Sequence, residues 1–352
     1  MAICKTVGKI TMVDIANAAN VSQPVVSAVL NNNYKNIKVS KENREKILRI
    51  AQEKNYYFNA AARALSSKRT GNIGFILSDN ISDGWANATF ARSLNGAEGA
   101  CRELGYNINI CRYNLSNLDS FVFPEKIGQR SVDGILFTGY VNADVLRKFK
   151  EFDIPGVCIG DNLGVRDIMP TVACDFVNGL YLSVNALNEL GHRHIIICAQ
   201  QTERERDIIA QLIFLLRRRN CPVDIDYYQP ESYLGNYNDA ASLFQYWKSF
   251  TPEKRPSAII ATDQVLISLL AIIQKEHYRV PEDLSLISTC ESALCHYGLL
   301  PLSSIGYDLE KQGSIAARML IEHLSDDAPL TPEMSRVEPC HMNIRESITK
   351  HK

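Results

Sequence analysis

The sequence predicts two parts of different fold class: a small all-α head at the N-terminus and a larger α/β body of two doubly wound parallel-sheet subdomains. Three observations lead to this prediction. Residues 10–54 contain three helix-length segments that begin with capping residues. From Gly71 onward, short apolar runs alternate with amphipathic helical segments. The 352 residues also exceed what a single hydrophobic core usually serves, so we expect two or three domains.

The first two predicted helices form a pair around a tight turn. Thr11 can cap the first helix, with Asp14 at its third position, as in a capping box. Asn20 tolerates the positive φ that such a turn requires. Ser22 can cap the second helix, and Pro24 is harmless in the first turn because its missing N–H would have no intrahelical partner there.

The second helix, which ends near residue 31, separates its side chains into two faces. Helical spacing places Val26, Val29 and Leu30 on the buried face. The side chains left pointing outward are Gln23, Pro24, Ser27, Ala28 and Asn31. An outward face at the start of a second helix is what a helix-turn-helix presents to the DNA major groove. An ordinary helical hairpin at the start of a larger domain is the alternative.

A third helix is predicted after a polar loop, from a cap at Ser40 to about Lys54. The side chains expected on its inner side are Ile47, Leu48, Ile50 and Ala51. The three helices make a compact head of residues 1–58.

The charges of the chain segregate between head and body. Residues 1–70 hold 12 Lys and Arg against 4 Asp and Glu, a net charge of +8. The other 282 residues hold 26 basic and 35 acidic side chains, a net charge of −9. A basic head on an acidic body indicates a polyanionic partner for the head alone.

Residues 11–31 resemble the DNA-binding signature of the LacI/GalR family of bacterial transcription repressors. The matching residues are Thr11, Asp14, Ile15, Ala16, Ala19, Val21, Ser22, Val26, Ser27, Leu30 and Asn31. The sequence departs from the signature at Asn20, Val25 and Ala28, where the family has Gly, Thr and Arg. An alanine offers only an apolar contact, suited to a thymine methyl, so Gln23 and Asn31 become the expected hydrogen-bonding readers of the operator.

The resemblance also implies a hinge at residues 59–70. In the family the matching short helix folds in the minor groove when paired with its dimer mate, and a leucine, here Leu65, wedges between base pairs. Phe58 stands where the family has Pro. The DNA-binding residues that the resemblance implies are Thr11, Ser22, Gln23, Pro24, Val25, Ser27, Ala28, Asn31, Asn59, Ala62, Arg63 and Leu65.

The body, residues 71–352, reads as repeated βα units. The predicted strands are residues 73–78, 108–112, 134–138, 156–160, 171–174, 195–199, 224–228, 258–262 and 284–288, and helices between them include 90–104, 179–190, 237–249 and 266–276. Repeated βα units imply parallel sheets with helices on both faces and ligands at the carboxyl ends of the strands.

The body resembles the periplasmic-binding-protein-like effector domain of the same family. The landmarks are Gly191-His192-Arg193-His194-Ile195, Val280-Pro281-Glu282-Asp283-Leu284-Ser285 and Asp133-Gly134-Ile135. Three crossings join the halves of that fold, and we place them near Cys174, Ser303 and Thr331. The first subdomain would then hold residues 71–173 and 304–331, and the second residues 174–303 and 332–352.

The resemblance further implies that a small-molecule effector, carbohydrate-related, binds between the subdomains. Matching to the family nominates Asp83, Trp85, Asp161, Arg206, Thr262, Asp263 and Glu291 as effector-binding residues. Each has a structural alternative: Trp85 as a core residue, Asp161 as a turn residue, and Arg206 as an exposed arginine beside Arg204.

The last landmark of the cleft departs from the family. The family has G-(F/Y)-D-D, whose first acid accepts from two sugar hydroxyls, but residues 288–291 here read Ser-Thr-Cys-Glu. Cys290 accepts such bonds poorly, and Glu291 would point to the opposite side of an extended chain. Either the ligand differs from a simple hexose, or Asp161, Asp263 and Glu291 take over this role. We expect an acidic or modified sugar, held by Arg206 and Trp85; a protein that senses no small molecule is the alternative.

The resemblance implies a homodimeric repressor that binds double-stranded operator DNA and dimerises through the body, with the helix at 90–104 as the candidate surface. The sequence has no phosphate loop, G-x-G-x-x-G or G-x-S-x-G, so it predicts neither an enzyme nor a cofactor. The ten cysteines and seven histidines are scattered without metal-ligand spacing, so we expect no metal.

The N-terminus has no apolar core of a signal peptide, and no apolar run of about 18 residues occurs in the chain. We therefore expect a cytoplasmic protein without a membrane partner. The runner-up interpretation is a sugar-binding protein of transport, which shares the body fold but needs a secretion signal and has no use for a basic head.

Overall fold

The computed structural model describes residues 10–30, 34, 37–56, 69–81, 84–160, 164–200, 202–230, 236–326 and 329–351. The chain divides into two compact units, Met1–Gly71 and Asn72–Lys352. The first unit is the head and the second is the body.

The described residues of the head form three helices, α1 (Met12–Ala19), α2 (Gln23–Leu30) and α3 (Lys41–Glu53). The predicted capping box is confirmed, because the Thr11 hydroxyl accepts from the Asp14 N–H and the Asp14 carboxylate accepts from the Thr11 N–H. Asn20 ends α1 in the left-handed conformation, with φ of 59°. The helices pack through small and branched residues: Ile15, Ala16, Ala19, Val26, Val29, Ile47 and Ala51.

The third helix differs from the prediction at Leu48. The Ser40 hydroxyl caps α3 by accepting from the Asn43 N–H, as expected. Ile47 and Ala51 are buried, but the Leu48 side chain is 43% exposed. Only a narrow stripe of α3 meets α1 and α2, and Leu48 follows Ile47 by about 100° around the helix, beyond that stripe.

The described residues of the body form two six-stranded sheets. The first sheet has the order β11-β5-β4-β3-β1-β2 and its pairs are parallel. Its strands are β1 (Asn72–Ser78), β2 (Asn107–Tyr113), β3 (Gly134–Thr138), β4 (Gly156–Ile159), β5 (Thr171–Cys174) and β11 (Arg336–Glu338). The second sheet has the order β12-β10-β9-β8-β6-β7, in which only the β10–β12 pair among the described strands is antiparallel. Its strands are β6 (His194–Cys198), β7 (Asp224–Tyr228), β8 (Ala258–Ala261), β9 (Ser285–Ser288), β10 (Ser303–Gly306) and β12 (His341–Asn343).

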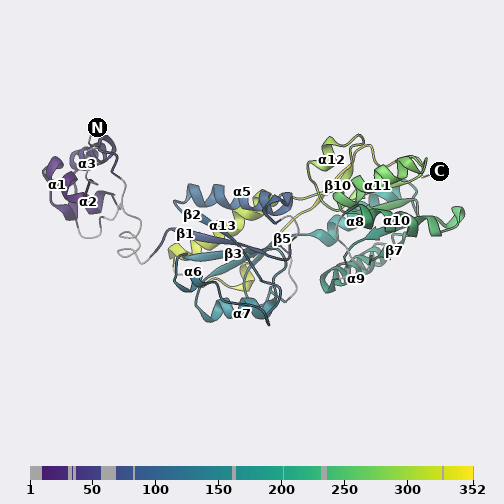
Figure 1. Ribbon diagram of the computed structural model, residues 1–352, viewed down its shortest axis with the longest axis horizontal. Helices are drawn as coiled ribbons and strands as arrows, with labels where there is room; N and C mark the ends of the chain where they lie inside the picture. The colour runs from purple at the N-terminus through teal and green to yellow at the C-terminus, as the bar shows by residue number, and fades with distance from the viewer. Residues whose placement is uncertain are drawn as a thin grey trace, which may run out of the picture. The chain divides into compact units, whose positions relative to one another are not determined.

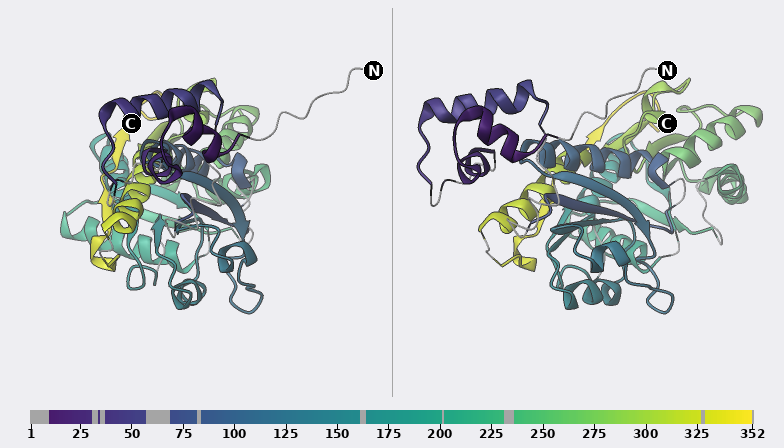
Figure 2. Two further views of the ribbon diagram at one scale, coloured as in Figure 1. Left: turned by 90° about the vertical axis from the view of Figure 1, so that its left-hand side faces the viewer. Right: turned by 60° about the vertical axis from the view of Figure 1, so that its left-hand side comes forward.

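Helices cover both faces of each sheet (Figures 1 and 2). In the first subdomain α5 (Ala88–Glu103) and α13 (Leu309–Asp326) pack on one face, and α6 (Glu125–Gly128) and α7 (Ala143–Glu151) on the other. In the second subdomain α8 (Phe176–Glu189) and α9 (Glu203–Arg218) pack on one face, and α10 (Tyr237–Ser249) and α11 (Asp263–Lys275) on the other. The short elements are α12 (Leu294–Tyr297), η1 (Gly84–Ala86), η2 (Pro252–Lys254) and η3 (Pro332–Met334). The predicted doubly wound architecture is confirmed.

Two of the predicted crossings between the subdomains are misplaced. Within the described residues the chain crosses after β5, after β10 and after β11. Because β10 lies in the second sheet, that crossing follows Gly306, not Ser303. Because Arg336 pairs with Val172 of β5, residues 336–338 belong to the first sheet, and the last crossing follows Glu338 rather than lying near Thr331. These strands are three or four residues long, and pairing with distant strands, not local pattern, decides their sheet.

The helices α5 and α13 approach each other closely. A Cβ atom on Gly96 of α5 would lie 1.8 Å from the Glu310 carbonyl oxygen, and one on Gly313 of α13 would lie 1.9 Å from the Ser93 carbonyl oxygen. The two glycines therefore permit a backbone contact that no other residue would allow.

The Gly191-His192 landmark has a structural explanation. The buried His192 ring lies 2.8 Å from the Ser257 hydroxyl through Nδ1 and 2.9 Å from the Thr349 carbonyl oxygen through Nε2. Since a carbonyl only accepts, Nε2 carries the proton and Nδ1 accepts from Ser257. Burial lowers the pKa of His192, which favours this neutral form. The histidine thereby ties the C-terminal segment to the second subdomain.

Candidate functional site

The start of α2 is one of the exposed segments of the head. Ser22, Gln23 and Pro24 are exposed. The Ser22 carbonyl accepts from the N–H groups of Val25 and Val26 at 3.0 and 3.3 Å, so it opens the helix. The first turn of α2 therefore presents its side chains to the surroundings of the head, as the sequence predicted for Gln23 and Pro24.

The prediction that Ala28 points outward is wrong. Its side chain is only 5% exposed, and Ser27 and Val25 are half-buried, with Val25 packed on the head core. The methyl group of an alanine is short enough to be covered by the atoms around it, and helical spacing does not reveal this. The exposed side chains of α2 that remain candidates for base contact therefore lie in its first turn.

The remaining predicted DNA-binding residues divide into two groups. Thr11 is exposed, and its hydroxyl donates to the Asp14 carboxylate at 2.7 Å. Hydrogen bonds from the Thr11 backbone and side chain hold the pKa of Asp14 below its usual value, so this cap stays charged. The predicted residues that lie outside the described part of the chain are Asn31, Asn59, Ala62, Arg63 and Leu65.

A cavity of about 440 Å³ lies between the two subdomains of the body, at the carboxyl ends of the strands. Its apolar lining comes from Ile81, Phe90, Gly139, Ile159, Gly160, Cys174, Phe176, Leu180, Ile197, Cys198, Ala199, Ile209, Cys290 and Leu309. Its polar lining comes from Thr89, Tyr140, Gln200, Thr202, Arg204, Glu205, Thr262, Thr289, Tyr307 and Gln312. A cavity of this size, mostly apolar with convergent polar groups, is typical of small-molecule sites.

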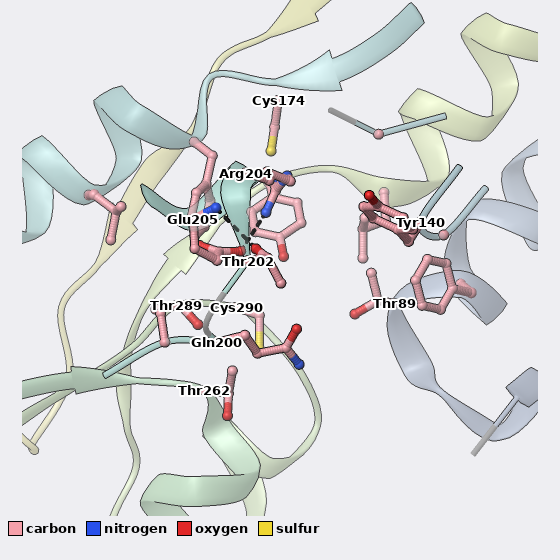
Figure 3. Close-up of a pocket in the computed structure, with 18 of the residues that line it drawn as sticks. Thr89, Tyr140, Cys174, Gln200, Thr202, Arg204, Glu205, Thr262, Thr289 and Cys290 are labelled. Carbon is pink, nitrogen blue, oxygen red and sulfur yellow. Dashed lines mark hydrogen bonds and ion pairs between the residues drawn. The ribbon is translucent and has the colours of Figure 1, made fainter. Parts of the chain in front are cut away.

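The polar side chains approach the cavity from opposite walls (Figure 3). Thr89 and Tyr140 come from the first subdomain, and Arg204, Thr262 and Gln200 from the second. A molecule between the walls would contact both subdomains, so its binding can favour one relative position of the two.

The charged residues of the described lining are Arg204 and Glu205, in the first turn of α9. Thr202 caps this helix by accepting from the Glu205 N–H at 3.1 Å. The Arg204 guanidinium and the Glu205 carboxylate form an ion pair of 2.7 Å. The Arg204 guanidinium also lies 5.9 Å from the centre of the Phe176 ring.

The structure places Arg206, the nominated cleft arginine, away from the cavity. Its side chain is exposed and does not line the cavity. Residues two positions apart on a helix differ in direction by about 200°, so Arg204 and Arg206 cannot face the same wall. Arg206 is therefore an exposed arginine beside Arg204, which was its structural alternative.

Trp85, the second nominated effector residue, lies away from the cavity. The half-buried indole packs against the core of the first subdomain, with its ring centre 6.0 Å from that of Phe75. It does not line the cavity. Asp83 and Asp161, which were also predicted to bind the effector, lie outside the described residues.

Asp263 and Glu291 do not line the cavity, whereas Thr262 does. The Asp263 carboxylate is buried and accepts from the Ser292 hydroxyl and the Gln264 N–H. The Glu291 carboxylate lies 2.6 Å from Arg345, 2.5 Å from His296 and 2.9 Å from the Asn343 amide. Burial raises the pKa of Glu291, but hydrogen bonds from Arg345, Ser304 and Asn343 outweigh it and hold the pKa below the usual value.

Cys290 lines the cavity at the position of the family's first acid, and Glu291 points elsewhere, as expected for consecutive residues of an extended chain. Burial raises the pKa of the Cys290 and Tyr307 side chains, so both are neutral. The wall of the cavity at this strand end carries no carboxylate among its described residues.

Sequence reasoning missed most of the lining, including Thr89, Tyr140, Gln200, Tyr307 and Gln312. They come from different βα connections and from the start of α13. This helix follows the crossing whose position the sequence predicted wrongly. The sequence did predict that ligands bind at the carboxyl ends of the strands. That rule identifies the loops that line a cavity, but not the single residues.

No described helix combines the length and the apolarity that a membrane span needs. Across the described ranges, no group of three or more His, Cys, Asp or Glu side chains is arranged to hold a metal ion. No disulfide joins the nine described cysteines, five of which are buried.

Comparison with protein families gives two matches. Residues 11–59 match the family described as bacterial regulatory proteins, lacI family. Residues 184–348 match the periplasmic binding protein-like domain. The first match covers the head and the second lies within the body.

Relatives of similar length cover nearly the whole chain. The chain is 26% identical over 325 residues to catabolite control protein A of Priestia megaterium, covering 90% of this chain and 93% of that protein. It is 26% identical over 326 residues to the HTH-type transcriptional repressor PurR of Vibrio parahaemolyticus, covering 90% and 92%.

Solved structures share the fold. The lac repressor dimer bound to operator and the anti-inducer ONPF matches with a TM-score of 0.76 at 19% identity, covering 97% of this chain and 99% of that chain. The transcriptional regulator CelR in complex with cellobiose matches with a TM-score of 0.66 at 22% identity, covering 96% and 99%.

Proposed function

The chain belongs to the lacI family of bacterial regulatory proteins, and from this membership we propose that it is a sequence-specific transcriptional repressor whose binding to operator DNA is controlled by a small molecule in the body cavity. The observation that carries the proposal is the exposed first turn of α2 on a three-helix head, in a region of net charge +8. The cavity between the subdomains supports the second half of the proposal.

The DNA-binding half follows from the shape and charge of the head. A capped α1, a left-handed Asn20 and an exposed start of α2 are the parts that a helix-turn-helix needs to place its second helix in the major groove. The basic side chains of the head neutralise phosphates, which supplies affinity without sequence information. Sequence would be read by Gln23, whose amide can form two hydrogen bonds with an adenine edge.

We expect Gln23→Ala to weaken binding to the operator by about 1–3 kcal/mol and to leave binding to scrambled DNA nearly unchanged, because a base contact is lost and phosphate contacts remain. Fluorescence anisotropy with both duplexes measures the difference. Gln52→Ala, on the exposed side of α3, is the matched control and should alter neither affinity. Equal losses on operator and scrambled DNA would count against a reading role for Gln23.

The functional unit would be a homodimer, because a single three-helix head offers few base contacts. Two heads on adjacent half-sites would place their recognition helices about 34 Å apart along the DNA. The exposed side chains of α5 include Asn95, Glu98, Arg102 and Glu103, which are polar. Exposed apolar side chains among the described residues instead include Leu294, Tyr297 and Leu299, on and after α12. We assign the dimer contact to this α12 segment, since exposed apolar groups of this kind mark association surfaces.

Leu299→Asp should shift the dimer toward monomer by at least about tenfold in dissociation constant, because a buried contact would acquire an unpaired charge. Sedimentation velocity over a concentration series measures this. Phe214→Asp, which places the same charge on an exposed aromatic of α9, is the control and should leave the dimer intact. A dimer unaffected by Leu299→Asp would move the interface elsewhere.

Two other functions fit less well. A sugar-binding protein of transport would use the same body, but it gives no role to the basic head. The relatives are regulators rather than enzymes, and we propose that this chain likewise performs no catalysis. A protein that acts on operator DNA would work in the bacterial cytoplasm.

A further inference from the structure

Gln312 is a cavity residue whose side-chain amide nitrogen is left without a hydrogen-bond partner. It lies in the first turn of α13, directly after the crossing from the second subdomain to the first. The residue is 2% exposed, and its amide nitrogen is buried with no partner in the structure. Its backbone N–H donates to the Asp308 carbonyl at 3.1 Å, so the helix itself is complete.

An unpaired amide beside a cavity implies that the occupant supplies the partner. Buried polar groups are nearly always paired, because an unpaired one loses its hydration without compensation. The terminal torsion of glutamine is broad, so the amide can turn its N–H₂ group toward the cavity at little cost. The matching group on a ligand is a hydrogen-bond acceptor, and a carbonyl oxygen is the simplest.

The charge of the described lining favours a neutral occupant. Arg204 is neutralised by Glu205 at 2.7 Å, and both side chains are half-buried. An anionic ligand would have to compete with Glu205 for the guanidinium, and a cationic ligand would compete with Arg204. Cys290, which stands at the strand end where a carboxylate would otherwise hold sugar hydroxyls, adds no charge.

The apolar lining favours an occupant with a compact apolar body. Phe90 from the first subdomain and Phe176 from the second contribute aromatic rings, and Ile159 and Ile197 contribute branched aliphatic groups. The four threonines of the lining carry hydroxyls that can donate or accept, and they accommodate neutral polar groups without selecting a charge.

We propose that the cavity binds a neutral small molecule bearing a carbonyl group, an amide, lactam or ketone, and that Gln312 selects it by donating to the carbonyl oxygen. The inference rests on the proposed function in that it treats this cavity as the effector site. It differs from the sequence-based expectation of an acidic sugar held by Arg206.

The test uses pairs of compounds that differ only in charge: nicotinamide with nicotinate, and glucuronamide with glucuronate. Binding to the full-length chain is measured by thermal shift and by calorimetry. We expect the amide of at least one pair to bind about tenfold or more tightly than its acid, because only the amide is neutral at pH 7. Gln312→Leu should remove most of this binding.

Gln312→Leu has a second readout that does not depend on the ligand. Replacing an unpaired buried amide by an apolar group of similar size should raise the melting temperature of the unliganded protein. Gln274→Leu, on the exposed side of α11, is the matched control and should change neither the melting temperature nor ligand binding.

Three results would overturn the inference: acids that bind as tightly as their amides, amide binding unchanged in Gln312→Leu, or no binding of any of the compounds at millimolar concentration. A lower melting temperature of unliganded Gln312→Leu would also overturn it, since the amide would then have a partner in the protein. The proposed function is tested separately by DNA binding without ligand. A chain that binds operator DNA but none of the amides would lose only this inference.

Discussion

Gly96→Ala is expected to destabilise the body by about 3 kcal/mol, whereas Gly99→Ala in the same helix should stabilise it by up to about 1 kcal/mol. A Cβ atom at residue 96 would lie 1.8 Å from the Glu310 carbonyl oxygen, so α5 and α13 must separate to admit it. A Cβ atom at residue 99 meets nothing within 4 Å, and alanine there lowers the entropy of the unfolded chain.

The comparison is made by urea denaturation followed by circular dichroism and tryptophan fluorescence. Trp85 packs against the core that α5 and α13 share, so its emission reports on this region. Gly313→Ala should resemble Gly96→Ala, because its Cβ atom would lie 1.9 Å from the Ser93 carbonyl oxygen. If Gly96→Ala and Gly99→Ala had the same midpoint, the close approach of the two helices would be wrong.

Glu291→Ala is expected to cost about 3 kcal/mol or more, because it leaves the Arg345 guanidinium without its carboxylate. The two side chains are only 17% and 18% exposed and lie 2.6 Å apart. Arg345 also donates to the Leu302 carbonyl at 2.6 Å, so the pair joins the end of the chain to the segment before β10. The exposed pair of Lys148 and Glu151 is the control, and Glu151→Ala should cost less than about 1 kcal/mol.

The same pair makes stability depend on pH in the acid range. Because the pKa of Glu291 is lower in the folded protein than its ordinary value of 4.5, the carboxylate stabilises the fold above that value. This stability is lost as the pH falls below 4.5 and through the folded pKa. Thermal unfolding across this range should show a smaller acid loss in Glu291→Ala than in the parent protein. An equal loss in both would mean that another group is responsible.

The sequence was sufficient where local chemistry decides the structure. The Thr11–Asp14 capping box, the left-handed Asn20 and the long apolar strands such as β1 and β3 follow from side-chain type and spacing. It was insufficient where a distant partner decides. Val337 on β11 has no apolar run around it, and its place in the first sheet comes from pairing with Ala173.

The candidate sites show the same division. Exposure of Gln23 followed from helical spacing, but burial of Ala28 depends on how neighbouring atoms cover a single methyl group. The sequence around Arg204 and Arg206 does not show which arginine faces the cavity. The structure shows that Arg204 does, from its position in the first turn of α9. The unpaired amide nitrogen of Gln312 cannot be predicted from the sequence, because a missing partner is a property of three-dimensional packing.

The central claim is that the chain recognises a DNA sequence through its basic head. The most direct test is an anisotropy titration of the full-length chain against a near-palindromic duplex selected from random DNA and against a scrambled duplex, each at several salt concentrations. We expect the selected duplex to bind about a thousandfold or more tightly, with affinity for both falling steeply as salt increases. Equal affinity for the two duplexes, or no binding to either, would contradict the account.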